Sequence, residues 1–449
     1  MKKLLVANRG EIAVRIIRAA KELGIPVVLA HSSADKDSLA ARLADECVEI
    51  GPPQVAKSYL NQAAIIEAAK SSGADAIHPG YGFLAENPSF AKLVEETGLV
   101  FVGPKGETIV MMGDKAAARA TAVAANVPVV PGSEGVLRDV TEAFEAAKEV
   151  GYPLIIKAAA GGGGKGMRVV QTEAQFVKEF EVAQREGLGA FGDDGMYLER
   201  FIPRARHIEV QVLGDGTDVI HLYDRECSLQ RRRQKVFEEA PSPVLSDEVR
   251  EKLCASAVAL AKSVNYRGAG TVEYLYDDQS GEFFFIEMNT RIQVEHPITE
   301  MITGVDLIRE MLHIAAGNAL RYEQDEIKIR GAAVECRINA EDPANNFMPN
   351  IGKIESLRWG DGPGVRVDSM LYEGYSIPPF YDSMLAKLIV WDESREEALE
   401  RMGRAIKETT ISGLKTTLPL HLKLVKDADM QAANTHTNWL EEWMEKQDW

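Results

Sequence analysis

The chain has 449 residues, which is too long for one ordinary hydrophobic core, so we expect two or three domains. Hydrophobic residues make up 45% and charged residues 27%, which is typical of a folded globular protein and not of a disordered one. The formal net charge of −17 argues against a general nucleic-acid-binding surface, because such a surface needs clustered Lys and Arg facing phosphates. A local basic pocket for a small anion is still compatible with this charge.

The cysteines and the N-terminus indicate the compartment. No CxxC pair occurs, and the four cysteines lie far apart, at Cys47, Cys227, Cys254 and Cys336. This spacing argues against a disulfide framework or a zinc site and favours reduced thiols. The short apolar run Leu4–Ala7 is typical of a first strand, not of a signal peptide. No stretch approaches the roughly 20 apolar residues of a membrane span. We expect a cytoplasmic protein with no membrane or nucleic-acid partner.

Short apolar strands alternate with amphipathic helices over the first hundred residues. Lys3–Ala7 is predicted to be a strand, Glu11–Leu23 a helix with apolar residues at helical spacing, and Pro26–His31 the next strand. The same pattern recurs further along, at Ile65–Ala69, Ala76–His78, Phe90–Glu95 and Val100–Val102. This alternation is typical of a parallel sheet with helices on both faces. We therefore expect an N-terminal α/β domain over residues 1–113.

The rest of the chain divides into three parts. A helical stretch with a proline-marked end covers residues 114–130. Residues 131–202 form a compact unit with the order helix, strand, glycine loop, strand, helix, strand, at Thr141–Val150, Leu154–Lys157, the glycine loop, Met167–Val170, Glu173–Glu186 and Met196–Arg200. From His207 onward the strands are longer, with a helix at Asp247–Val264 and a hairpin at 269–289. Residues 203–449 are expected to be the large C-terminal domain.

The glycine run Gly161–Gly164, continued by Lys165 and Gly166, satisfies GxGxxG and nearly matches a P-loop. Both motifs require a helix directly after the loop, whereas Met167–Val170 is strand-like. The better interpretation is a hairpin tip whose backbone N–H groups close over a polyphosphate. The alternative is an ordinary floppy turn, but five glycines exceed what a turn needs, and each costs conformational entropy on folding.

The hairpin at 269–289 carries a candidate metal site. If its turn centres on Ser280, Glu273 and Glu287 face each other across the strand pair, where like charges are destabilising. A divalent cation between the two carboxylates relieves this repulsion, and Mg²⁺ together with a nucleotide fits hard oxygen ligands. Asn289 lies on the same strand face as Glu287 and adds a neutral oxygen. A solvated face with a different register is the alternative.

Residues that can bind an anion follow this hairpin. Arg291 presents a planar fork of donors that suits an oxyanion such as bicarbonate. Glu295 is a candidate general base if the fold brings it within reach, although a lone Arg–Glu pair is more often a salt bridge. The cationic run Gln230–Lys235 is either a solvated edge strand or one wall of an anion pocket.

Four more polar residues are ambiguous when taken alone, namely Lys115, Lys157, His207 and Arg337. Lys157 ends an apolar strand just before the glycine loop, where an amine favours a phosphate or nucleobase acceptor. His207 starts a strand and suits a core role as well as a ribose contact. Arg337 lies in the predicted strand Val334–Ile338 and is a candidate to face the same cleft.

Seven segments, taken in order, resemble biotin carboxylase of the ATP-grasp superfamily over essentially the whole chain. They are "ANRGEIAVRI" (7–16), "HPGYGFLAEN" (78–87), "MGDK" (112–115), "IIKAAAGGGGKGMRVV" (155–170), "RHIEVQV" (206–212), "EMNTRIQVEHPITE" (287–300) and "VECRINAED" (334–342). The resemblance implies a pre-ATP-grasp parallel α/β domain, a mobile ATP-grasp lid and a large C-terminal catalytic domain with a mainly antiparallel sheet.

The resemblance also assigns roles to residues. ATP is expected to contact Lys115, Lys157, Gly163, Gly164, Met167, Glu199, Ile202, His207, Gln230, Glu273 and Glu287. Magnesium or manganese ions are expected on Glu273, Glu287 and Asn289. Bicarbonate is expected on Arg291, Gln293 and the backbone of Val294, and its phosphorylated form on Lys235.

The chemistry implied by the resemblance begins when Glu295 deprotonates bicarbonate for attack on the γ-phosphate, which gives carboxyphosphate. Carboxyphosphate yields CO2 and phosphate, the phosphate takes the proton from biotin N1′, and Arg337 stabilises the biotin enolate. The lid excludes water from this fragile intermediate. Two departures from the family occur: Arg233 stands where many members have His, which puts the ribose contact there in doubt, and Lys165 stands where some have Arg.

The expected partners follow from what the sequence lacks. It contains no Met-Lys-Met biotinylation motif and no carboxyltransferase-sized extension. We therefore expect biotin on a separate carboxyl carrier protein, separate carboxyltransferase subunits and, by resemblance, a homodimer. The reaction is then the first half-reaction of acetyl-CoA carboxylase in fatty acid synthesis. Service to a propionyl-CoA, pyruvate or other 2-oxo acid carboxylase, another ATP-grasp ligase, or an inactive nucleotide-binding scaffold are the alternatives.

Overall fold

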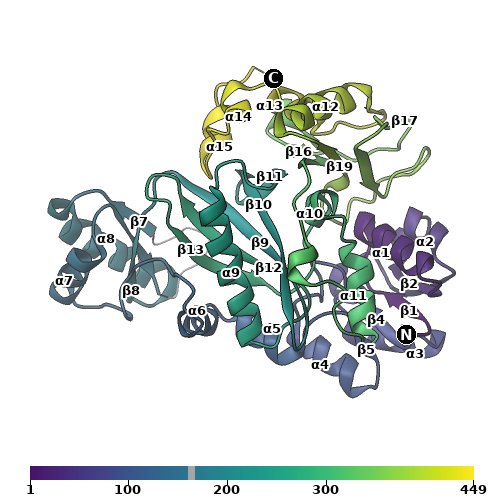
Figure 1. The fold of residues 1–449 in the computed structure, drawn as a ribbon, viewed down its shortest axis with the longest axis horizontal. Coiled ribbons are helices and arrows are strands. Elements are labelled where there is room, and N and C mark those ends of the chain that lie inside the picture. Colours follow the sequence, from purple (N-terminus) through teal and green to yellow (C-terminus); the bar gives the residue numbers. More distant parts are fainter. Residues whose placement is uncertain (160–166, 449) are drawn as a thin grey trace. The chain divides into compact units, whose positions relative to one another are not determined.

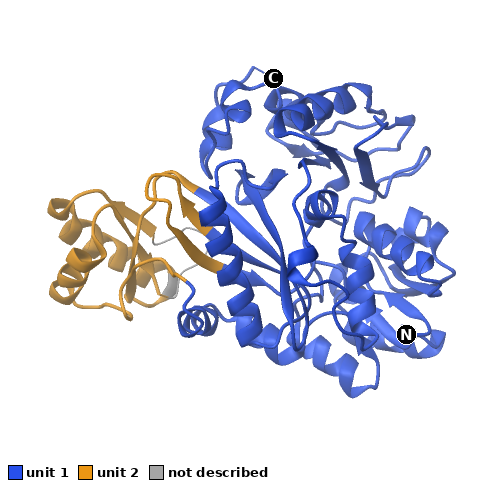
Figure 2. Ribbon diagram, viewed as in Figure 1, with its two compact units in different colours: residues 1–127, 206–274, 287–449 blue, residues 128–205, 275–286 orange. Residues whose placement is uncertain are grey.

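The computed structural model describes residues 1–159 and 167–448. It divides into two compact units (Figure 2). The larger unit comprises residues 1–127, 206–274 and 287–449, and the smaller unit comprises residues 128–205 and 275–286. The smaller unit is thus built from two separate stretches of the chain. The predicted glycines Gly163 and Gly164 lie outside the described residues.

A parallel sheet forms the N-terminal part of the larger unit (Figure 1). Its strands have the order β3-β2-β1-β4-β5, with bounds β1 Leu4–Val6, β2 Val27–Ser32, β3 Glu46–Gly51, β4 Ala76–His78 and β5 Val100–Phe101. Every neighbouring pair is parallel, which confirms the α/β class predicted from the alternating pattern.

Helices cover both faces of this sheet. They are α1 Gly10–Glu22, α2 Leu39–Leu43, α3 Gln62–Ser72, α4 Pro88–Glu96 and α5 Gly106–Gly113, and α6 Lys115–Ala124 follows α5 and packs beside α9 Asp247–Ser263. Because side chains alternate along a strand, Leu4 of β1 enters one core with α1, whereas Leu5 enters a second core with α3 and α4. Asp114 ends α5 and caps α6 by accepting the backbone N–H of Ala117, so the helix predicted from Asp114 begins at Lys115.

A three-stranded antiparallel sheet and two helices form most of the smaller unit. The strand order is β7-β6-β8, with bounds β6 Leu154–Ala158, β7 Met167–Val170 and β8 Met196–Arg200, and the helices are α7 Val140–Val150 and α8 Glu173–Phe191. One core joins the buried side chains of this sheet to both helices. The strands flanking the glycine run therefore pair as a hairpin, as predicted, with Lys157 opposite Met167.

An eight-stranded sheet follows the order β13-β12-β9-β10-β11-β14-β19-β18, and the pairs from β9 to β18 are antiparallel. The strands are β9 Ala205–Asp215, β10 Val219–Arg231, β11 Gln234–Ala240, β12 Arg267–Asp277, β13 Phe283–Asn289, β14 Ala332–Asn339, β18 Val365–Ser369 and β19 Met384–Asp392. Two small ribbons pair β15 Glu341–Asp342 with β16 Met348–Pro349, and β17 Leu357–Arg358 with β20 Thr410–Ile411.

The remaining helices belong to the larger unit. Their bounds are α9 Asp247–Ser263, α10 His296–Thr303, α11 Leu307–Ala315, α12 Arg395–Glu408, α13 Leu418–Leu424, α14 Ala428–Gln431 and α15 Trp439–Met444. Helix α10 packs on one face of the sheet against β11, β14 and β19, whereas α12 packs on the opposite face. In the described part of the chain, no helix has both the length and the apolar character needed to cross a membrane.

One local prediction requires correction, and one of two alternatives left open by the sequence is excluded. The hairpin tip pairs Asp277 with Glu282, with Gly281 in the left-handed conformation, so the turn does not centre on Ser280. The cationic run is not an edge strand, because β10 and β11 lie inside the sheet order. It is a tight turn in which Gln230 pairs with Lys235 across the two strands. Arg232 and Arg233 at the turn are exposed, whereas the side chain of Lys235 reaches the buried Glu295.

Candidate active site

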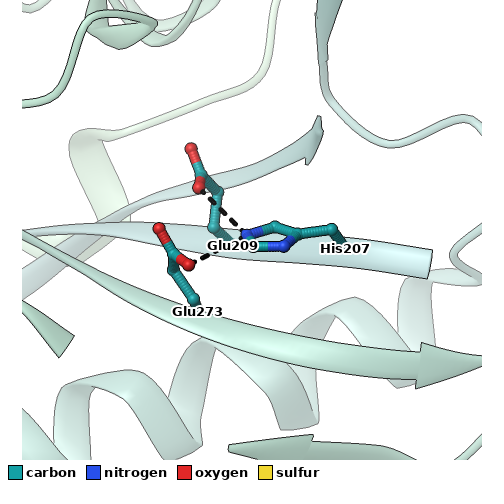
Figure 3. Close-up of side chains that lie close together, drawn as sticks. All are labelled: His207, Glu209 and Glu273. Carbon is teal, nitrogen blue, oxygen red and sulfur yellow. Dashed lines mark ion pairs between the residues drawn. The ribbon is translucent and has the colours of Figure 1, made fainter. Parts of the chain in front are cut away.

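Neighbouring strands bring acidic and basic side chains together (Figure 3). His207 and Glu209 lie two positions apart on β9, so they share a strand face, and Glu273 of the adjacent β12 points toward them. His207 Nε2 is 3.0 Å from Glu273 and 3.7 Å from Glu209. Burial by itself lowers the pKa of His207, but the two carboxylates outweigh it and raise the pKa to about 9. The imidazole is therefore cationic at neutral pH.

Lys235 connects three of the carboxylates. Its Nζ donates to Glu209 and to Glu295 at 2.5 Å each, and to Glu273 at 3.3 Å. Burial opposes the charge on Lys235, but the carboxylates hold its pKa well above the usual value. Burial likewise opposes the charge on Glu295, yet Lys235 holds the pKa of that carboxyl below its usual range. Both groups are thus ionised at neutral pH, which a general base and an anion-binding lysine require.

Arg337 contacts the same carboxylate from another strand. Its guanidinium donates to Glu295 Oε2 at 3.0 Å and lies 2.6 Å from Glu238 Oε1. Glu295 thus has Lys235 on one oxygen and Arg337 on the other. These three residues come from different segments of the sequence, and the structure brings them together. Glu238 on β11 was not predicted.

Arg225 supports the cluster of His207, Glu209, Lys235 and Glu273 through its ion pair with Glu209. Its side chain is fully buried, and it donates to Glu209 at 2.7 Å. The other donors reach four polar side chains, Gln211, Thr271, Gln293 and Thr299, at distances of 2.7 to 3.1 Å. Because these contacts come from several strands and a helix, one buried guanidinium holds several elements in register.

Of the three residues predicted to bind a metal, Asn289 and Glu273 are in direct contact. Asn289 Nδ2 and Gln293 Nε2 each donate to Glu273 Oε1 at 2.8 Å. Glu287 is half-buried, and burial together with the charge of Glu273 raises its pKa. Two carboxylates that repel each other beside an amide oxygen fit the oxygen ligands of a divalent cation. His207, Glu209 and Glu273 also lie close enough to share an ion.

The expected bicarbonate residues have supports that the sequence did not reveal. Arg291 Nε donates to Glu86 Oε2 at 2.8 Å, and its Nη2 donates to Asn289 Oδ1 at 2.8 Å. Val294 presents its carbonyl to Lys387, whose Nζ donates at 2.6 Å. Glu86 and Lys387 therefore fix the segment that carries the expected anion site. Both come from parts of the chain far from residue 291, so no local pattern points to them.

The residues expected to contact the nucleotide are divided between the two units. In the smaller unit, Lys157 forms an ion pair with Glu199 across β6 and β8, Ile202 is buried with Val130 and Phe284, and Met167 is exposed. In the larger unit, Lys115 is exposed at the start of α6, and Gln230 Nε2 donates to the carbonyl of Cys227 at 2.9 Å. The roles expected for these residues stay predictions.

Some of the missed residues carried a signal in the sequence. Along β9, the polar side chains of His207, Glu209 and Gln211 alternate with apolar ones, yet Glu209 and Gln211 are fully buried. When the polar face of a strand is buried, its polar side chains must find hydrogen-bond or ion-pair partners inside the protein. The period of two in "RHIEVQV" is therefore evidence for a buried polar site, in addition to being a point of resemblance.

Three family models cover nearly the whole chain. Residues 114–323 match the ATP-binding domain of the carbamoyl-phosphate synthase L chain, which defines the class as an ATP-dependent ligase. Residues 1–109 match the N-terminal domain of biotin carboxylase, and residues 335–442 match its C-terminal domain.

Named relatives agree with these matches. Biotin carboxylase 1 of Bacillus subtilis is 53% identical over 442 residues, covering 98% of both chains. A component of pyruvate carboxylase from Methanothermobacter thermautotrophicus is 52% identical over 442 residues, covering 98% of this chain and 90% of the relative. The chain belongs to the biotin carboxylase family.

A solved structure extends the comparison to ligands. The biotin carboxylase domain dimer of Hydrogenobacter thermophilus 2-oxoglutarate carboxylase, in complex with MgADP, ADP and bicarbonate, is 49% identical with a TM-score of 0.86. The match covers 98% of this chain and 97% of that one. It supports the predicted mixed α/β fold with its parallel and antiparallel sheets.

Proposed function

We propose that this chain carboxylates biotin in an ATP-dependent reaction with bicarbonate, on a separate carrier protein. The observation that carries the proposal is the Glu295 carboxylate, held between Lys235 and Arg337. A general base and two cations converge where bicarbonate loses a proton and negative charge develops. Membership of the biotin carboxylase family supports the same reaction.

The residues divide the chemistry among them. Glu295 is the base that takes the bicarbonate proton, so that a bicarbonate oxygen attacks the γ-phosphate, ADP leaves and carboxyphosphate forms. Lys235 and Arg291 hold these anions by charge. Carboxyphosphate breaks into CO2 and phosphate, the phosphate accepts the biotin N1′ proton, and the resulting biotin anion attacks CO2. Arg337 stabilises that anion through its guanidinium.

Magnesium or manganese bound to Glu273, Glu287 and Asn289 would neutralise the phosphate charge of ATP. In this chain Asn289 Oδ1 accepts a hydrogen bond from Arg291. A cation bound to this oxygen would replace Arg291 as its partner. The related domain, a dimer that binds MgADP and bicarbonate, supports magnesium, nucleotide and bicarbonate as the bound groups and also supports a homodimer. Carboxyltransferase subunits would complete the cycle.

The final acceptor is a finer proposal. We favour acetyl-CoA, which makes this the first half-reaction of fatty acid synthesis. Relatives include a component of pyruvate carboxylase and a domain of 2-oxoglutarate carboxylase, so pyruvate and other 2-oxo acids are the alternative acceptors. Purifying the native complex and assaying it with each acceptor distinguishes them.

The reaction is tested with the purified chain. ATP hydrolysis should require bicarbonate and rise when free biotin is added, whereas stimulation by an amine would identify an amide ligase instead. The Glu295→Gln variant should bind ATP normally and lose carboxylation by about 10²- to 10⁴-fold, because its amide cannot take the proton. Wild-type carboxylation by this variant would contradict the role of Glu295 as the base.

A further inference from the structure

Two glutamates face each other in the interior of the large sheet. Glu238 on β11 and Glu335 on β14 are direct partners in the antiparallel register, so their side chains leave the same face of the sheet. Neither side chain is exposed to solvent. Like charges directly opposite each other destabilise a strand pair, and burial increases that repulsion. The pair therefore cannot hold two negative charges without compensation.

The two carboxyl groups differ in their partners. Glu238 Oε1 accepts from Arg337 Nε at 2.6 Å, which ties it to the candidate active site. Neither oxygen of Glu335, nor Glu238 Oε2, has a hydrogen-bond partner among the described residues. An ionised carboxylate that is buried without a partner costs several kcal/mol or more, and such a group takes up a proton instead. Glu335 is thus the member of the pair that favours the neutral form.

The cations near Glu335 are engaged by other groups. The charged groups on the same face are Arg337, which is paired with Glu238 and Glu295, and Lys387 on β19. Lys387 Nζ is engaged by the Val294 carbonyl at 2.6 Å and lies 3.4 Å from Glu11 and 4.0 Å from Asp368.

Groups further along this face are also paired with one another. Arg366 of β18 is paired with Glu300 of α10 and with Asp368, and Arg15 of α1 is also paired with Glu300. His296 of α10 is buried, and burial holds its pKa well below the usual value, so it is neutral. On the opposite sheet face, Cys336 packs against Met402 of α12 and offers no charge.

The titration behaviour agrees with this geometry. Burial raises the pKa of Glu335 well above its usual value, and Lys387 offsets this only in part. Burial also raises the pKa of Glu238, but the paired Arg337 opposes the rise and keeps the pKa of Glu238 below that of Glu335. When one proton is available to the two groups, it therefore resides on Glu335.

We propose that Glu335 is a positioning residue that stays protonated at neutral pH and so leaves Glu238 free to anchor Arg337 as a carboxylate. This proposal rests on the biotin carboxylation proposed above, in which Arg337 stabilises the biotin anion. Ionisation of Glu335 at high pH places a second negative charge beside Glu238. The Arg337 guanidinium is then drawn toward the two carboxylates and away from Glu295, and carboxylation falls while ATP binding is kept.

Infrared spectroscopy tests the proton directly. The wild-type enzyme without substrates should show the carbonyl band of a buried protonated carboxyl group, and the difference spectrum between wild type and Glu335→Gln should contain it. Glu310→Gln is the matched control, because Glu310 is equally buried but is ion-paired with Arg321, and it should leave the band in place. A wild-type spectrum without such a band overturns the proposal even if the variant does not fold.

The pH profile tests the positioning role. A carboxamide mimics the neutral acid, so Glu335→Gln should keep the wild-type kcat at neutral pH. Its alkaline limb of biotin carboxylation should move up by at least about one pH unit, because no proton is left to lose at this position. A profile that superimposes on the wild type, or loss of activity at every pH, overturns the positioning role. The infrared band does not depend on any activity, so failure of the carboxylase function is distinguishable from failure of this inference.

Discussion

The two units hold their charged residues in opposite ways. In the larger unit, Arg225, Glu209 and Lys387 are fully buried, and their charges are met by partners from several strands. In the smaller unit, the Lys157 and Glu199 side chains keep 36% and 28% of their surface exposed while they pair. Water screens such a pair and can replace either partner. The difference indicates that the larger unit is preorganised for the reacting groups, whereas the smaller unit holds its polar groups loosely.

This contrast has an energetic consequence. Breaking a buried pair leaves an uncompensated charge and costs about 3–5 kcal/mol, whereas breaking an exposed pair costs about 1 kcal/mol or less. The difference between the units can therefore be tested by single substitutions that remove one partner at a time.

The largest effect is expected at Arg225. Replacing it with Met removes five hydrogen bonds and leaves Glu209 with less compensation, so the free energy of unfolding should fall by about 3–5 kcal/mol. The matched change in the smaller unit is Arg168→Met, which breaks the pairs with Glu179 and Glu186 and should cost about 1 kcal/mol or less. Denaturant titration measures both, and equal losses would remove the distinction between the units.

An intermediate effect on the free energy of unfolding is expected when acid protonates Asp368. Burial alone raises the pKa of Asp368, but Arg366 and Lys387 outweigh it and lower the pKa to about 2. The unfolded pKa is about 3.9, so this group contributes about 2.6 kcal/mol of stability above pH 5, which is lost as the pH falls toward 2. Asp368→Asn should flatten this part of the stability–pH curve. Lys252 also lowers the pKa of Glu248, but water screens this exposed pair, so Glu248→Gln should flatten the curve much less. An equal flattening by both variants would contradict the assignment.

The smallest effect on stability is expected at Lys157. Lys157→Met should change the free energy of unfolding by about 1 kcal/mol or less, because its pair with Glu199 is partly exposed. If Lys157 contacts the nucleotide, ATP affinity should fall by about tenfold or more, as loss of a charge-assisted hydrogen bond requires. Calorimetric titration with ATP measures this, and Lys148→Met, which removes an exposed pair with Glu145, is the control. Unchanged affinity in Lys157→Met would contradict the nucleotide role.

Local patterns in the sequence predicted the structure best. The strands β7 and β8 have the predicted bounds, and the parallel N-terminal sheet follows from the alternation of strands and helices. The hairpin tip was predicted less well, since Gly281 adds a bulge that shifts the pairing to Asp277 and Glu282. A bulge of one residue has no strong signature, so arithmetic on a turn centre fails by one position.

Sequence alone determined the fold class and the family, and the resemblance to that family predicted Lys235, Glu295 and Arg337 as reacting residues. Only the tertiary structure revealed which groups hold them in place. The sheet order β12-β9-β10-β11-β14-β19 makes neighbours of strands that are far apart in the chain, so Lys387 reaches Val294 and Glu335 faces Glu238. Side-chain periodicity is a property of one strand, whereas the partner of a buried charge is chosen by the strands beside it.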